Sequence, residues 1–346
     1  RPALLARRTV GARPRCGPCR LREPMDNVLT CRVAPGKAWR GAIVWVGAPA
    51  EAGGHGRGGA LIKLVLSDMD NTLVPFGAGK ASRRTVDAIH ACQEQGIDFG
   101  PASGRDRGEL SSFFDEDASC YNTGVLVNGQ KVYYLGEVVY EKTLPADELR
   151  RAEAIAARVE GCAFITYRDD NFGDWVGATR EELGPMFERV FLCGGERHEL
   201  DAMPDYPVVK AGIVVMGDNA RAVELSRVLS DACPSLEFPN TVANWLDVSP
   251  RGWGKADGIA ILQKILGLAD EEVCVFGDAD NDLGMLGRYP NSCAVANANE
   301  AATRAARWHV GASADDGVAR AMEQIAAAAR ESRELGREVA PAFMRA

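Results

Sequence analysis

The chain has 346 residues, of which 46% are hydrophobic and 25% are charged, and its formal net charge is −8 at pH 7. This length suits two ordinary domains, and the composition is that of a globular protein with a sizeable core. The negative charge argues against nucleic acid or an anionic membrane as a partner, because the average surface would repel either one. No apolar run approaches the roughly 20 residues that a membrane-spanning helix needs. The sequence therefore predicts a soluble protein whose anionic ligands require locally placed positive groups.

The ten cysteines are scattered along the chain rather than clustered. Cys92, Cys162, Cys274 and Cys293 lie in apolar stretches, which is typical of buried free thiols in a reducing compartment. We expect a cytoplasmic protein.

Residues 1–60 differ from the rest of the chain. They are rich in Arg, Gly, Pro and Ala, contain few acids and show no sustained periodicity, so we expect no folded domain there. The chain also begins at Arg1 rather than Met. We interpret this segment as translated upstream sequence or an unstructured extension, and expect the functional protein to start near Leu61.

From Leu61 onward, strand patterns alternate with helix patterns, which indicates a parallel sheet with helices on both faces. The first predicted strand, 61–67, precedes a helix that Ser82 caps and Gly96 ends. Further strands are predicted at 97–102, 273–276 and 292–296. The polar motifs follow these strands directly, at the sheet edge where ligands bind in open α/β folds.

The middle of the chain has its own pattern of helices and strands. We predict helices at 146–159, 179–190 and 219–230, and strands at 162–167 and 208–216. This pattern predicts an inserted α/β domain. The resulting organisation is a core in two parts, 61–143 and 245–335, interrupted by an insert at 144–244 and followed by a tail at 336–346.

An acid pair follows the first predicted strand. In the pentapeptide 68–72, Asp68 and Asp70 stand two positions apart at an exposed strand end. One carboxylate can attack phosphorus while the other donates a proton to the leaving oxygen and later activates water. A solvated turn would use the same residue types, since Asp and Asn are common turn formers. The pair alone therefore leaves both interpretations open.

Four ordered motifs resemble those of the haloacid dehalogenase (HAD) superfamily. The Asp-x-Asp-x-Thr pattern at 68–72 resembles the first, and Ser103, at the end of the second predicted strand, resembles the second. Lys255, ahead of an apolar helix, resembles the third, and the acidic segment 277–282 resembles the fourth. The resemblance spans nearly all of residues 61–325. It implies a Rossmann-like parallel-sheet HAD core with helices on both faces.

The position of the insert indicates which subgroup of the superfamily the chain resembles. A large α/β segment after the second motif, together with the segments 127–129, 297–298 and 315–319, is similar to the Cof-type subgroup with a class IIB cap domain. That subgroup implies a phosphatase acting on a small phosphorylated metabolite such as a hexose phosphate, phosphoglycolate, a sugar-acid phosphate or a flavin-precursor phosphate. Asn71 departs from the family, where many members have Gly, but Asn tolerates left-handed backbone geometry.

The resemblance also implies a mechanism. Asp68 would attack phosphorus to form an aspartyl-phosphate, while Asp70 protonates the leaving alcohol and then activates water. Two carboxylates beside a phosphate dianion require a cation, and Mg²⁺ is the hard, oxygen-seeking choice. Its implied ligands are the Asp68 carboxylate, the Asp70 backbone carbonyl and Asp278, with Asp282 nearby.

Other residues are expected around the phosphate. Lys255 would oppose the negative charge that builds on the phosphoryl oxygens. Arg105 is interpreted as a structural residue at a helix start. The expected phosphate or substrate contacts are Ser103, Gly104, Asn128, Gly129 and Asn281. Asn281 would orient either the phosphate or Lys255.

Two rival functions remain open. A phosphomutase would pass the phosphoryl group to a second hydroxyl, and activation by a sugar bisphosphate would reveal it. A catalytically inactive binding domain would lack one of the acids, and Asp68, Asp70 and Asp278 are all present. The sequence leaves a monomer and a homodimer equally plausible.

Overall fold

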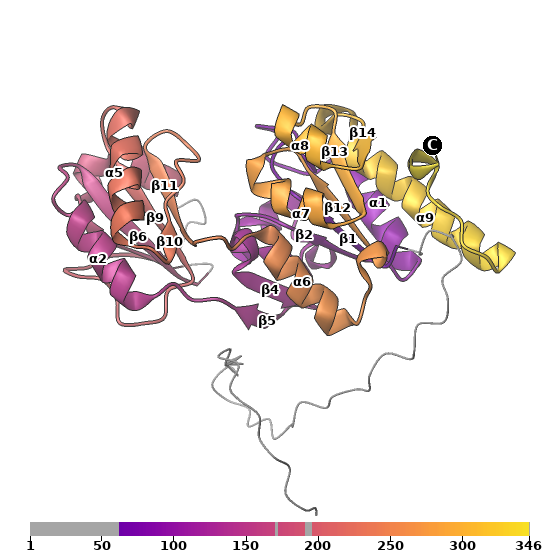
Figure 1. Ribbon diagram of the computed structural model, residues 1–346, viewed down its shortest axis with the longest axis horizontal. Coiled ribbons are helices and arrows are strands. Elements are labelled where there is room, and N and C mark those ends of the chain that lie inside the picture. The colour runs from indigo at the N-terminus through magenta and orange to yellow at the C-terminus, as the bar shows by residue number, and fades with distance from the viewer. Residues whose placement is uncertain (1–61, 170–171, 191–195, 346) are drawn as a thin grey trace, which may run out of the picture. The chain divides into compact units, whose positions relative to one another are not determined.

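The computed structural model describes residues 62–169, 172–190 and 196–345 (Figure 1). The expectations for residues 1–60 therefore lie outside the described residues. In the part of the chain that the structure describes, no helix combines the length and the apolar character needed to cross a membrane. Two sheets, each with its own helices, organise these residues.

The first sheet contains five strands in the order β14-β13-β12-β1-β2, and all of its pairings are parallel. Its strands are β1 (Leu64–Ser67), β2 (Asp98–Pro101), β12 (Val273–Gly277), β13 (Asn291–Val295) and β14 (Trp308–Val310). Leu64 is in register with both Asp98 and Val273, so β1 lies between β2 and β12 and the three strands end together. This arrangement confirms the predicted parallel α/β core.

Helices cover both faces of this sheet. On one face lie α1 (Arg83–Glu94) and α9 (Gly317–Leu335), which pack on Val65 and Phe276. The other face, with Leu64 and Leu66, packs against α6 (Lys255–Leu266), α7 (Leu283–Arg288) and α8 (Glu300–Ala305). Alternate strand residues thus enter opposite cores, as a sheet buried on both faces requires.

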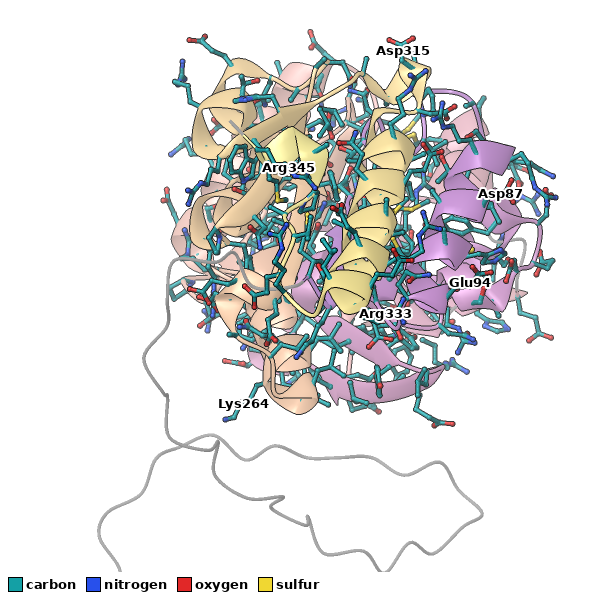
Figure 2. The ribbon with its side chains drawn as sticks, turned by 90° about the vertical axis from the view of Figure 1, so that its right-hand side faces the viewer. Asp87, Glu94, Lys264, Asp315, Arg333 and Arg345 are labelled. Carbon is teal, nitrogen blue, oxygen red and sulfur yellow. The ribbon has the colours of Figure 1, made fainter. Side chains whose placement is uncertain are left out.

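The helices α1 and α9 lie side by side on their face of the sheet (Figure 2). Arg84 of α1 donates from Nε and Nη2 to the carboxylate of Glu323 on α9, at 2.7 and 2.6 Å. Gly336 ends α9 with a left-handed conformation at φ 62°. Beyond it, Phe343 packs against the core, so part of the predicted tail contributes to this face.

A small antiparallel sheet extends the core and was not predicted. It consists of β3 (Gly124–Leu126), β4 (Lys131–Tyr134) and β5 (Glu137–Glu141). A parallel bridge between Ala102 and Val125 joins it to the end of β2. This junction brings the segment around Asn128 next to Ser103, since the Asn128 amide donates to the Ser103 carbonyl oxygen at 3.0 Å.

The second sheet contains six strands in the order β10-β11-β9-β6-β7-β8. Its strands are β6 (Cys162–Asp169), β7 (Phe172–Gly177), β8 (Glu196–Glu199), β9 (Lys210–Val215), β10 (Leu236–Glu237) and β11 (Trp245–Pro250). All of its pairings are antiparallel except the one between β7 and β8. Because β11 pairs with β9, this sheet continues to Pro250, beyond the predicted end of the insert at residue 244.

Helices cover both faces of the second sheet as well. The helices α2 (Ala146–Ala156) and α5 (Asn219–Ala232) pack on one face, while α3 (Arg180–Leu183) and α4 (Pro185–Val190) belong to the other. The single helix predicted at 179–190 is wrong. Gly184 takes φ 48° between α3 and α4, and the proline that follows has no amide hydrogen to continue the first helix.

Candidate active site

The site begins at Asp68, directly after β1. Its backbone amide donates to the Phe276 carbonyl oxygen at 2.9 Å, which fixes the residue at the carboxyl edge of the sheet. The side chain is buried, with the residue 7% exposed. Asp70 lies two positions later, and its side chain is 51% exposed. The two acids therefore have different surroundings, one desolvated and one in contact with solvent.

Lys255, the first residue of α6, supplies the positive charge. It is 1% exposed, and its ammonium donates to Oδ1 of Asp68 at 2.5 Å and to Oδ1 of Asp282 at 2.7 Å. A buried ammonium is tolerated only when it is paired, and here two carboxylates pair with it. These carboxylates raise the pKa of Lys255 above its ordinary value although burial opposes them, so the group stays charged.

The loop after β12 supplies two further acids. Oδ2 of Asp282 accepts from the amides of Asp278 and Ala279, at 2.9 and 3.1 Å. Asp278 accepts from Thr72 Oγ1 at 2.6 Å and from Asn71 Nδ2 at 3.0 Å. Asn71 has φ 64°, the left-handed conformation that the sequence led us to expect. The first and fourth motifs thus meet through these hydrogen bonds.

Three carboxylates could hold a metal ion. Asp68, Asp278 and Asp282 each offer an oxygen, and these oxygens lie within 4.8 Å of one another. Asp282 is 0% exposed and its oxygens accept from Lys255 and from backbone amides, whereas Asp68 and Asp278 are each 7% exposed, so those two are the more accessible carboxylates. A donor set of oxygens alone fits a hard divalent cation.

The charges of this cluster also favour a cation. Burial is the main reason that the pKa of Asp68 is raised to about 7; Lys255 opposes this shift, and the neighbouring Asp282 and Asp278 add to it. The pKa of Asp278 is raised as well, chiefly by burial. One lysine thus leaves the buried carboxylates only partly neutralised.

Ser103 and Gly104 follow β2 on the adjacent strand. Ser103 is 1% exposed, and its Oγ accepts from the Arg105 amide at 3.2 Å. A Cβ on Gly104 would lie 3.3 Å from the side chain of Asn128. Ser103 and Gly104 therefore lie close to Asn128, which was expected to contact the same phosphate or substrate.

Asn128 and Gly129 differ in their surroundings. Within the described residues, Oδ1 of Asn128 is buried without a hydrogen-bond partner. Gly129 has φ 91°, and a Cβ there would lie 2.2 Å from the Gly254 carbonyl oxygen. Its own carbonyl oxygen accepts from Trp253 Nε1 at 3.1 Å. The structure thus gives Gly129 a packing position against the first turn of α6.

Asn281 lies in a short 3₁₀ helix, Asp280–Asp282, and is exposed. The two hydrogen bonds described for the Lys255 ammonium go to Asp68 and Asp282. The expectation that Asn281 orients Lys255 therefore gains no contact from this structure.

Arg105 is a residue whose contacts the sequence did not reveal. Its Nε and Nη2 donate to Oδ2 and Oδ1 of Asp70, both at 2.8 Å. The 3₁₀ helix after it, Arg107–Glu109, is capped by Asp106, so Arg105 does not cap this helix. The only available signal was its position two residues after Ser103, at the same sheet edge as Asp70.

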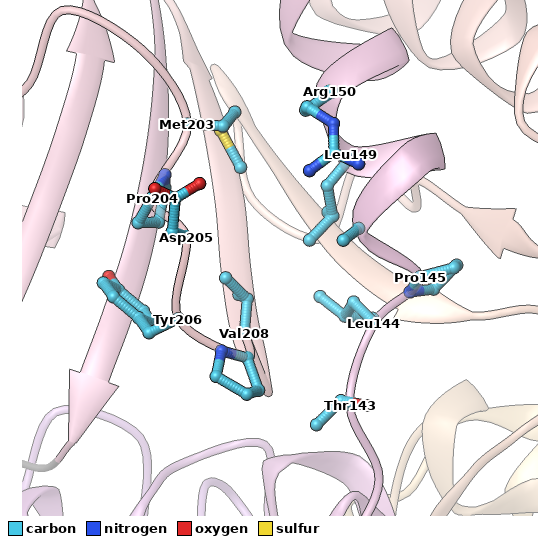
Figure 3. A pocket seen from close by; sticks show the side chains of 12 residues that line it. Thr143, Leu144, Pro145, Leu149, Arg150, Met203, Pro204, Asp205, Tyr206 and Val208 are labelled. Atoms are coloured by element: carbon cyan, nitrogen blue, oxygen red, sulfur yellow. The ribbon is translucent and has the colours of Figure 1, made fainter.

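A cavity of about 320 Å³ lies beside the second sheet (Figure 3). Residues 143–146, 149 and 150, at and just before the start of α2, line it on one side, and residues 203–208 line it on the other. None of the acids or the lysine described above contributes to its wall. It is therefore separate from the carboxylate cluster.

Comparisons with known proteins find a matching family model and relatives that are named as phosphatases. A family model described as haloacid dehalogenase-like hydrolase matches residues 65–322. A 5-amino-6-(5-phospho-D-ribitylamino)uracil phosphatase of Escherichia coli K12 is 28% identical over 274 residues, covering 76% of this chain and 96% of the relative. An HMP-PP phosphatase of Klebsiella pneumoniae is 28% identical over 250 residues, covering 69% of this chain and 85% of the relative.

Solved structures share the fold. A haloacid dehalogenase-like hydrolase from Bacteroides thetaiotaomicron aligns with a TM-score of 0.66 and 26% identity, over 76% of this chain and 99% of that one. A HAD subclass IIB sugar phosphatase aligns with a TM-score of 0.63 and 22% identity, over 75% and 98%. Because the family model spans well over half of the residues and includes every acid of the site, this chain belongs to the haloacid dehalogenase-like hydrolase family.

Proposed function

We propose that this protein is a Mg²⁺-dependent phosphatase that hydrolyses a small phosphorylated metabolite through an aspartyl-phosphate on Asp68. The observation that carries the proposal is the pairing of Asp68 with the buried ammonium of Lys255, beside Asp278 and Asp282. A carboxylate held by a fixed cation at the end of a parallel strand suits in-line attack on phosphorus.

In the first step, Oδ of Asp68 attacks phosphorus, and the bond from phosphorus to the leaving oxygen breaks. Asp70 donates a proton to that oxygen, which leaves as an alcohol. Lys255 keeps its charge and opposes the negative charge on the phosphoryl oxygens. Ser103 would donate its hydroxyl hydrogen to one of them, and this is supported by its Oγ accepting from the Arg105 amide, which leaves the hydroxyl hydrogen available.

In the second step, Asp70 accepts a proton from water, and the water oxygen attacks phosphorus. The bond between Asp68 and phosphorus breaks, which restores the carboxylate and releases inorganic phosphate. The exposure of the Asp70 side chain supports this role, because an acid that exchanges protons twice per turnover benefits from contact with solvent.

The metal would be held by the Asp68 carboxylate, the Asp70 backbone carbonyl and Asp278, with Asp282 supporting them. When bound, it supplies positive charge that brings the phosphate dianion and the Asp68 carboxylate together. The raised pKa values of Asp68 and Asp278 support this assignment, since a bound divalent cation would favour their ionised forms.

The substrate class follows from the relatives and from charge. The names of the two curated relatives specify a phosphorylated ribitylaminouracil and HMP-PP, which are small phosphorylated compounds. Because the net charge of −8 repels anions on average, a phosphate must be attracted by local positive charge, which Lys255 supplies.

The test is phosphate release from a panel of phosphorylated metabolites, with and without Mg²⁺, by the wild type and the Asp68→Asn variant. We expect Mg²⁺-dependent release that the variant lacks, while its thermal unfolding stays close to that of the wild type because Asn keeps an oxygen for Lys255. Retained turnover in the variant would refute the role of Asp68. A wild type that is active only with added sugar bisphosphate would indicate a mutase.

A further inference from the structure

The carboxylate of Asp70 is held by one side chain on both of its oxygens. Arg105 donates Nε to Oδ2 and Nη2 to Oδ1, each at 2.8 Å. Bidentate pairing of this kind fixes the direction of a carboxylate as well as its place. Asp70 remains 51% exposed, so little other packing holds it.

Arg105 is itself fixed from the other side. Its guanidinium lies over the ring of Phe113, at 4.7 Å from the ring centroid, and its amide donates to Ser103 Oγ. Its side chain is 24% exposed, about half the exposure of Asp70. Because β1 and β2 are adjacent and parallel, Asp70 and Arg105 emerge at the same sheet edge. The arginine is thus the anchored member of the pair.

We propose that Arg105 is a positioning residue, which orients the Asp70 carboxylate toward the leaving oxygen of a phosphoester bound at Asp68. This inference rests on the proposed phosphatase function and adds a residue to it. The proton still passes from Asp70 to the leaving oxygen as the phosphorus–oxygen bond breaks, and Arg105 stays protonated throughout. Each Asp70 oxygen keeps a further lone pair for that proton, since Arg105 occupies only one on each.

A direct contact between Arg105 and the phosphate is the alternative role. The edge of the guanidinium formed by Nε and Nη2 is already committed to Asp70. A phosphate contact would affect every substrate alike, whereas positioning of the acid matters most when the leaving oxygen is a poor leaving group. The two roles therefore predict different patterns across substrates.

The experiment compares kcat/KM for a primary alkyl phosphate and for p-nitrophenyl phosphate, because p-nitrophenolate leaves without needing a proton. The Arg105→Met variant removes the donors and keeps an apolar stem over Phe113. We expect it to lower kcat/KM roughly 100-fold for the alkyl ester and less than about tenfold for the aryl ester. Arg105→Lys, which keeps the charge without the bidentate geometry, should fall between Arg105→Met and the wild type for the alkyl ester.

A matched control and a double variant sharpen the result. Arg107→Met removes a neighbouring arginine that donates instead to the Gly136 carbonyl oxygen and to Asn122, so it should change both esters equally. In an Asp70→Asn background, Arg105→Met should cost little more, because its effect acts through Asp70. Equal losses for both esters, full additivity with Asp70→Asn, or full rescue by lysine would each overturn the inference. A wild type that cleaves neither ester would instead count against the proposed function.

Discussion

Replacing Gly129 with alanine should displace the helix turn that carries Lys255. The added Cβ would lie 2.2 Å from the Gly254 carbonyl oxygen and 2.9 Å from its carbonyl carbon, and both are backbone atoms that cannot rotate away. Gly129 also has φ 91°, where a Cβ is strained, at a cost of roughly 1–2 kcal/mol. Overpacking adds roughly 1–3 kcal/mol. We therefore expect a loss of about 2–5 kcal/mol in the free energy of unfolding.

The control is Gly252→Ala, close to the same turn. Gly252 has φ 67°, but a Cβ there would meet no atom within 4 Å, so only the conformational cost of roughly 1–2 kcal/mol applies. The difference between the unfolding free energies of the two variants, measured in urea, gives the cost of the clash alone. The value of kcat/KM reports whether Lys255 has moved. Equal unfolding midpoints for the two variants, with unchanged turnover in Gly129→Ala, would refute the reasoning.

Two further predictions concern buried charge. Lys131→Met should cost roughly 3 kcal/mol in unfolding free energy, because it removes the ammonium that pairs with the buried carboxylate of Asp106 at 2.6 Å. The control is Lys80→Met, which removes an exposed ion pair and should cost less than about 1 kcal/mol. Although burial opposes the shift, Lys131 and Lys210 lower the pKa of Asp106, so the contribution of this pair is present at neutral pH and should fade in urea titrations below about pH 4. Asp278→Asn should raise the Mg²⁺ concentration for half-maximal activity roughly 10- to 100-fold, and an unchanged Mg²⁺ titration would contradict its role as a ligand.

Much of the core could be predicted from the sequence because its signals are local. The apolar run before Asp68 predicts a buried strand, and β1 occupies residues 64–67. Once the strands are parallel, the motifs that follow β1 and β12 must meet at one edge, which agrees with the hydrogen bonds from Asn71 and Thr72 to Asp278. The left-handed conformation of Asn71 agrees with a local property of the residue, because Asn tolerates that conformation.

The remaining features depend on contacts between distant segments. The strands β3 to β5 are short and β11 pairs with β9 across the chain, so local periodicity did not identify them. Asp68 was expected at the surface but is 7% exposed, because α6 brings Lys255 over it. The close approach of Gly129 to Gly254 and the pairing of Arg105 with Asp70 join residues that no sequence spacing links.

The measurement that tests the central claim most directly is capture of the phosphorylated enzyme. The protein would be mixed with Mg²⁺ and a substrate that it hydrolyses, quenched in acid within a single turnover, and digested for mass spectrometry. The account predicts a phosphoryl group on the peptide that contains Asp68, with more of it in Asp70→Asn and none in Asp68→Asn. Turnover without a phosphorylated peptide, or with the phosphoryl group on a different residue, would contradict the account.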